Sequence, residues 1–304
     1  MSSGNVKQVA IDNKCWDPKS GKPFEFCYAF NPTGRTSYAC TRREWRVFSL
    51  LAPSLKLDPR SNNYPFTIKP EIKVSPGKIM EIFRDTFEGT EFDMTKFMVS
   101  PKEIEVEGKD GKKKKMKVLA KNDYANPFLY YDEMYIHRIN GGWGELGERP
   151  LARAYCMYVH VTQSRSWLPD PVGGVVWMGL GNPAMTTYAP MYCQITDLPK
   201  SYTEEGRNHY RRGNAWWGFV RVSKLAARIW GQMRKDVAKV RDKLQNDGFK
   251  VQKEIEKKAV ELYKKDPKEA VKFLNKYTND FCNKIVDAYW KLGDDLWVKY
   301  QDKM

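Results

Sequence analysis

Three short apolar runs between residues 154 and 197 constrain the fold of this chain more than any other feature. They span Tyr155–Gln163, Gly174–Leu180 and Pro190–Thr196. The turn-forming stretches Leu168-Pro169-Asp170-Pro171 and Gly181-Asn182-Pro183 separate them. Apolar runs of this length, bounded by Pro, Gly, Asn and Asp, predict consecutive β-strands joined by tight connections.

Polar side chains lie at the ends of these predicted strands and in their turns. They are Gln163, Arg165, Asn182, Thr186, Thr187 and Tyr188. A rigid sheet edge that carries such side chains could hold a peptide-sized ligand. Arg165 could bind a carboxylate through two parallel hydrogen bonds, or it could pair with an acidic residue of the segment Arg84–Asp93.

The segment Arg84–Asp93 holds four acidic residues just after a predicted helix. Paired carboxylates at such a place could do acid–base chemistry, hold a cation or receive a substrate ammonium group. The alternative is a charged helix end, at which Asp85 or Glu88 satisfies nearby backbone groups.

Helices are predicted on both sides of the strand-rich block. In the N-terminal part, extended chain rich in Pro, Gly and aromatic residues precedes a short helix around Arg42–Ser49. Ser75 and Pro76 then form the cap and first turn of a helix that reaches about Phe87 and that Gly89 can stop.

From Asn214 onward, apolar residues recur every three or four positions, which is typical of amphipathic helices. One long helix is expected over residues 222–244, with an interruption at Gly248-Phe249 and a second helix after it. Asp266-Pro267 begins a third helix that runs nearly to the C-terminus.

Strands and helices in segregated blocks predict an α+β fold, with antiparallel strands followed by a C-terminal helical block. We expect residues 1–304 to form a single, incomplete domain. Its parts would be an extended wrap over residues 1–70, strands and a short helix over residues 71–212, and helices over residues 213–304.

The net charge of +15 does not indicate a nucleic-acid-binding protein. Much of the excess lies on C-terminal helices where Lys alternates with Glu and Asp. The Lys112–Lys115 run faces the acidic stretch Glu103–Glu107 across Gly108–Gly111, which predicts a surface β-hairpin with charge-paired strands. No apolar run approaches the ~18–20 residues of a membrane span.

Motifs for phosphate binding, serine catalysis or metal binding are absent from the sequence. With three histidines and no C-x-x-C pair, we expect no metal site and no cofactor. Cys156 and Cys193 fall within predicted apolar strands, where we expect buried thiols that act as small hydrophobic groups.

Several motifs together resemble the C-terminal portion of the dipeptidase A family of N-terminal-nucleophile (Ntn) cysteine peptidases, to which the secernins are related. They are VTQSRSWLPDPVGGVVWMGLGNPAMTTYAPMY, RDTFEGTEFD, CWDPKSGKPFEF, RREWRVFSLLAPS, YPFTIKPEIKVS and RGNAWWGFVRVSKLA. The resemblance implies part of a four-layer αββα sandwich and hydrolysis of the peptide bond of dipeptides. The family's nucleophile is a cysteine exposed by processing, whose own α-amine acts as the base.

The motifs present all belong to the later part of the family pattern. The nucleophile and its first hairpin are therefore expected before Met1, in a missing N-terminal portion that would also carry any export signal. Cys15 matches the mid-chain aromatic loop and not the nucleophile. We expect this chain alone to be inactive, with short peptides as substrates of the whole protein and an N-terminal portion or a second copy as possible partners.

The resemblance leaves the pocket and the compartment, cytoplasmic or exported, open. The candidates for substrate contact are Gln163, Arg165 and Asn182, with Glu88 or Asp93 facing a substrate ammonium. Two alternatives remain: a non-catalytic interaction domain of the same fold, and an amidase that acts on non-peptide amides.

Overall fold

A computed structural model describes residues 2–33, 37–97, 99–107, 112–128, 148–206 and 208–304. The chain divides into two compact units. The first comprises Met1–Val74 with Gly147–Arg149, and the second comprises Ser75–Leu146 with Pro150–Met304.

The first unit contains helices as well as the extended chain predicted for it. They are α1 (Val6–Asp12), α2 (Phe26–Phe30) and α4 (Tyr38–Leu51), with the short turns η1 (Pro18–Ser20) and η2 (Pro53–Leu55). Helix α4 confirms the predicted helix and extends it at both ends. Its buried Arg42 forms an ion pair with Glu148 at 3.1 Å, and its Trp45 donates to the carbonyl of Leu57 at 3.0 Å.

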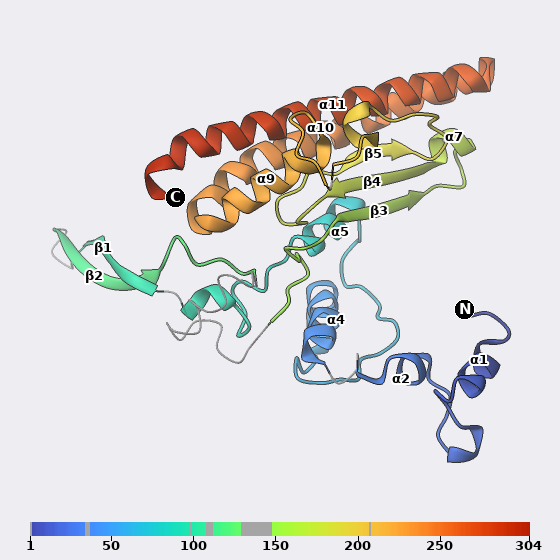
Figure 1. Cartoon of the computed structure of the whole chain (residues 1–304), viewed down its shortest axis with the longest axis horizontal. Coiled ribbons are helices and arrows are strands. Elements are labelled where there is room, and N and C mark those ends of the chain that lie inside the picture. The colour runs from blue at the N-terminus through green and yellow to red at the C-terminus, as the bar shows by residue number, and fades with distance from the viewer. Residues whose placement is uncertain (1, 34–36, 98, 108–111, 129–147, 207) are drawn as a thin grey trace. The chain divides into compact units, whose positions relative to one another are not determined.

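The second unit is built around a three-stranded antiparallel sheet in the order β3-β4-β5 (Figure 1). Its strands are β3 (Tyr158–Ser164), β4 (Gly174–Leu180) and β5 (Ala189–Tyr192), with the one-turn helix α7 (Asp170–Gly173) between the first two. All three predicted strands are present. The third ends early, at Tyr192, where the N–H of Ile195 bonds back to the carbonyl of Tyr192 in a turn; beyond it, Asn275 accepts the backbone N–H groups of Thr196 and Asp197.

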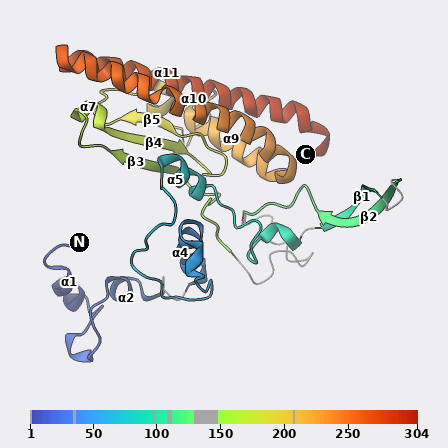
Figure 2. The same cartoon turned by 180° about the vertical axis from the view of Figure 1, so that it is seen from behind.

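Long C-terminal helices cover one face of this sheet (Figures 1 and 2). The helices are α9 (Ala215–Arg228), α10 (Trp230–Lys265) and α11 (Pro267–Tyr300), preceded by the short α8 (Lys200–Thr203). The α+β class and the C-terminal helical block are thus confirmed. In the described part of the chain, no helix is both long enough and apolar enough to cross a membrane.

The helix boundaries differ from the prediction at two places. The expected first long helix breaks at Ile229, whose backbone leaves the helical region and whose side chain is buried. The predicted interruption at Gly248-Phe249 is wrong, because α10 continues through both residues. Gly248 allows α10 to pack closely against α11, since a Cβ atom at this position would lie 2.9 Å from the ring of Phe281 on α11.

The core lies between the sheet and these helices. Val159 and Val161 on β3 are buried, whereas the alternate residues Tyr158, His160 and Thr162 are exposed. Trp177 of β4 packs against Phe249 of α10 with ring centroids 4.8 Å apart, and Tyr192 of β5 packs against Tyr277 of α11 at 6.3 Å. The period of two along β3 therefore separates a helix-covered face from an exposed one.

Helix α5 (Pro76–Phe83) packs against β3 and begins as predicted. The Ser75 hydroxyl caps it by accepting the N–H of Lys78 at 3.2 Å. It ends at Phe83, four residues before the predicted position, and the Asp85 carboxylate then accepts the N–H of Phe87, which is fully buried and has a left-handed φ of 63°. Such a conformation is strained for an aromatic residue and cannot continue a helix.

The predicted surface hairpin is also present. Strands β1 (Val99–Glu107) and β2 (Lys113–Lys121) pair antiparallel, with Glu105 opposite Lys115, and the short helix η3 (Met94–Phe97) precedes them. Its connecting residues 108–111 lie outside the described residues.

The expectation of buried strand cysteines is wrong. Cys193 is exposed and Cys156 is half-buried, since each lies just outside a strand. The buried thiol is that of Cys282 on α11, and burial raises its pKa to about 12. A thiol held in this neutral form is unsuited to nucleophilic attack.

Candidate functional site

Arg165 lies just beyond β3 and its guanidinium is already fully engaged. Its Nη1 pairs with Glu256 of α10 at 2.6 Å, and its other nitrogens donate to the carbonyls of Val172 and Gly173. The two side chains are 8% and 12% exposed. The partner is therefore an acid of the C-terminal helices, and not one of the segment Arg84–Asp93 as one prediction had it.

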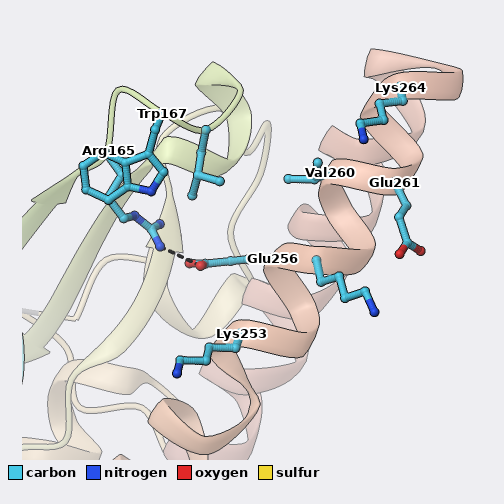
Figure 3. Close-up of a pocket in the computed structure, with 9 residues that line it drawn as sticks. Arg165, Trp167, Lys253, Glu256, Val260, Glu261 and Lys264 are labelled. Atoms are coloured by element: carbon cyan, nitrogen blue, oxygen red, sulfur yellow. Dashed lines mark hydrogen bonds and ion pairs between the residues drawn. The ribbon is translucent and has the colours of Figure 1, made fainter.

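A cavity of about 470 Å³ opens beside this ion pair (Figure 3). The loop after β3 provides Arg165, Trp167 and Leu168. Helix α10 provides the opposite wall, formed by Lys253, Glu256, Lys257, Val260, Glu261 and Lys264. Trp167 is 76% exposed, so the cavity is an open groove with an indole on one side and lysines on the other.

Gln163 belongs to the same hydrogen-bond network. Its Oε1 accepts from Trp177 Nε1 at 3.3 Å and from Gln252 Nε2 at 3.1 Å. Gln252 also donates to Glu256 at 2.9 Å. Gln163 and Arg165 are thus joined through α10, in a network that ties the end of the sheet to that helix.

Glu88 and Asp93 form a second group with basic partners. Glu88 accepts from Arg234 and from the indole of Trp230, at 2.7 and 2.8 Å. Lys121 bridges the two acids, 3.4 Å from Glu88 and 3.2 Å from Asp93. The two carboxylates are neutralised by the two cations Lys121 and Arg234. A substrate ammonium group would therefore have to displace one of them, and Lys121 is 38% exposed.

Asp93 is held by its own segment as well. Its carboxylate accepts from the N–H of Gly89 at 3.1 Å and from the N–H and hydroxyl of Thr95 at 2.9 and 2.5 Å. Burial alone would raise its pKa, but these hydrogen bonds together with Lys121 lower the pKa below the ordinary value of 3.8. Asp85 fits the alternative of a charged helix end, since its carboxylate accepts the backbone N–H of Phe87 at 3.0 Å.

Asn182 lies in a third group, the turn of residues 181–188 that joins β4 to β5, hereafter the β4–β5 turn. Asn182 is 1% exposed, and Thr186 and Thr187 are fully buried. The Asn182 carbonyl oxygen Oδ1 accepts the N–H of Ala184 at 3.0 Å, while its Nδ2 has no partner in the described structure.

Side chains from α10 and α11 and from the end of α5 hold the β4–β5 turn. Arg84, directly after α5, donates to the carbonyl of Thr186 at 3.3 Å, and Arg241 of α10 donates to that of Ala184 at 2.5 Å. Gln245 of α10 bonds both backbone groups of Tyr188, and Tyr289 of α11 donates to the carbonyl of Met185 at 2.6 Å.

The structure therefore brings Gln163 and Arg165 together, and separately Glu88 and Asp93, while Asn182 lies in its own group. Within the described residues, no hydrogen bond or ion pair joins the three groups. The sequence reasoning missed their partners. Arg84 lies directly after α5 and Lys121 at the end of β2, and the others are on α10 or α11: Arg234, Arg241, Gln245, Gln252, Glu256 and Tyr289. One available signal was the pair Gln252 and Glu256, four residues apart on one helix and therefore on one face.

We predict that Glu256→Gln destabilises the second unit by about 3–5 kcal/mol, because it leaves the buried Arg165 cation unpaired. Asp295→Asn is the matched control, since Asp295 forms an exposed i,i+4 pair with Lys291. It should change stability by no more than about 0.5 kcal/mol. Denaturant unfolding measures both; equal losses for the two variants would contradict the structural role of the Arg165–Glu256 pair.

A second prediction concerns pH. Because the folded pKa of Asp93 is below 3.8, its stabilising contribution is complete above that value and is lost as the pH falls through the folded pKa. Asp93→Asn should therefore cost about 1–3 kcal/mol near neutral pH and progressively less in acid. The exposed Asp287, replaced by Asn, is the control. A cost for Asp93→Asn that does not shrink in acid would refute this assignment.

The chain matches the model of peptidase family C69 over residues 1–243. A probable dipeptidase B of Streptococcus pyogenes serotype M1 is 22% identical over 227 residues, covering 75% of this chain and 38% of that protein. A probable dipeptidase of Latilactobacillus sakei is 22% identical over 195 residues, covering 64% of this chain and 32% of that protein.

The chain thus spans less than two fifths of the length of these relatives. The family match includes Glu88, Asp93, Gln163, Arg165 and Asn182, and it ends before Glu256. It confirms the family predicted from the sequence motifs. Because the match extends over most of the chain, this protein belongs to peptidase family C69.

Proposed function

We propose that this chain is the C-terminal part of a dipeptidase, which hydrolyses the peptide bond of dipeptides when its catalytic portion is present. The observation that carries the proposal is the family match over residues 1–243 together with relatives named as probable dipeptidases. The attacking group is a cysteine in polypeptide outside this chain, acting with its own α-amine as base.

The environments of the cysteines support the absence of the nucleophile from this chain. A reactive thiol needs a base or a positive environment that lowers its pKa. Burial instead raises the pKa of both Cys156 and Cys282. Among the described residues, no hydrogen bond joins a cysteine to a histidine or a carboxylate. The thiols of Cys15 and Cys156 donate to backbone carbonyls, and the exposed Cys40 sulfur accepts a long hydrogen bond of 3.8 Å from Arg43.

In this proposal the chain supplies the substrate side of the site. Gln163 and Arg165 hold the rim of the groove beside α10, and Glu88 and Asp93 provide negative charge for a substrate ammonium once Lys121 moves away. Asn182 offers an amide donor from the β4–β5 turn. These roles are proposed from the chemical type of each side chain and its place in the fold. Each of them requires a peptide to enter between side chains that are now bonded to other parts of the chain.

The test is a dipeptide-hydrolysis assay on two proteins: this chain alone, and the same chain extended by the reading frame that precedes Met1. We expect no turnover from the chain alone. The extended protein should cleave unblocked dipeptides and lose that activity after treatment with a thiol-alkylating reagent. A simple non-peptide amide serves as the second substrate.

Turnover by the chain alone would overturn the assignment of the nucleophile to another segment. An extended protein that lacks a leading cysteine, or that cleaves nothing, would support a non-catalytic interaction domain instead. Cleavage of the non-peptide amide in preference to dipeptides would support an amidase.

A further inference from the structure

Besides Asn182 Nδ2, two further buried hydrogen-bond donors in or next to the β4–β5 turn have no partner within the described structure. They are Nε of Arg84 and the phenol oxygen of Tyr188. Tyr188 is fully buried, and the Arg84 guanidinium lies over its ring, with Cζ 5.2 Å from the ring centroid. Buried donors are nearly always paired in folded proteins, so unpaired donors on two side chains that pack against each other point to a site for an acceptor.

The charge around these donors specifies the sign of that acceptor. Burial lowers the pKa of Arg84, and the nearby Arg241 lowers it further, yet an arginine stays protonated. Arg84 has no acidic partner among the described residues, whereas Arg241 is neutralised by Asp242 at 2.7 Å. The site therefore carries one uncompensated positive charge, which a single negative charge would balance.

The two donors cannot readily turn to each other or to other partners. The backbone of Tyr188 is held because Gln245 bonds both its N–H and its carbonyl, and its side chain is fully buried. Arg84 is fixed because its Nη2 donates to Thr186 and its backbone N–H caps α5. Arg84 keeps some exposed surface, so a ligand would enter on its side. Burial also raises the pKa of the Tyr188 phenol, which keeps it a donor at any physiological pH.

We propose that Arg84 and Tyr188 form a carboxylate-binding site, and that its ligand is the C-terminal carboxylate of a short peptide. An arginine N–H and a phenol O–H each donate to one carboxylate, and the charge-assisted bonds compensate for taking the carboxylate out of water. The choice of a peptide carboxylate rests on the proposed function. The anion site itself rests on the two unpaired donors and the unbalanced charge.

The test uses this chain with glycylglycine and glycylglycine amide, which differ only in the terminal carboxylate, and with inorganic phosphate. Binding is measured by calorimetry and by the shift in melting temperature. We expect glycylglycine to bind and stabilise the chain, and the amide and phosphate to do so at least about tenfold more weakly.

Three variants locate the site. Tyr188→Phe removes only the hydroxyl, and Arg84→Lys keeps the charge but removes the Nε–H donor. Each should weaken glycylglycine binding by about tenfold, the change expected for one charge-assisted hydrogen bond. Arg212→Gln removes an exposed charge that pairs with Asp294, and it should bind as the unmodified chain does.

No binding of glycylglycine, equal binding of its amide, or unchanged binding by Tyr188→Phe would overturn the site. Phosphate binding as tight as that of glycylglycine would overturn the peptide carboxylate as its ligand. These outcomes are separate from the proposed function. If the complete protein cleaves dipeptides but substitutions of Arg84 and Tyr188 do not change binding, the proposed function stands and this site is refuted. If the chain binds the carboxylate as expected but the complete protein cleaves no dipeptide, the site stands and the proposed function is refuted.

Discussion

The second unit depends on covering one apolar face of its three-stranded sheet. Val159, Val161, Trp177 and Tyr192 all lie on that face, and removing such large side chains from water contributes most of the stabilisation available to the unit. Helices α10 and α11 provide the cover, with 36 and 34 residues respectively. Gln163 and Arg165 lie at the end of β3, where they bond to α10 directly or through Gln252, and the β4–β5 turn joins two strands of the same sheet.

Polar groups that are buried at the margin of such a contact are destabilising unless they are paired. Most of those in this chain are paired, but some are not. Arg165 is satisfied by Glu256 and two carbonyls, so its ion pair behaves as a structural tie between sheet and helix. Glu88 and Asp93 are likewise neutralised by cations. The Arg84 and Tyr188 donors differ because they are unpaired, and a binding site must retain such unused capacity.

Local patterns in the sequence predicted much of this fold. The spacing of apolar runs and turn residues located β3, β4 and the start of β5, and the caps at Ser75 and Asp266 located the starts of α5 and α11. Gly248 was misread because a glycine required for close helix packing looks in sequence like one that ends a helix.

The candidate site was predicted less well, for a physical reason. Gln163, Arg165 and Asn182 were identified from strand-end positions, but what each can bind depends on partners distant in the sequence. Glu256 follows Arg165 by 91 positions. No local sequence pattern predicts such a pairing. Because of it, Arg165 is part of an ion pair within the chain and is not a free binding group for a substrate carboxylate. Arg84 was passed over for the opposite reason: that its Nε is buried without a hydrogen-bond partner in the described structure is visible only in three dimensions.

A crystal structure of this chain with glycylglycine tests the central claim most directly, because two arginines compete for one carboxylate. We expect the carboxylate to lie within hydrogen-bond distance of Arg84 Nε and the Tyr188 hydroxyl, with Glu256 still bound to Arg165. A peptide carboxylate bound to Arg165 with Glu256 displaced, or crystals without bound peptide, would contradict it.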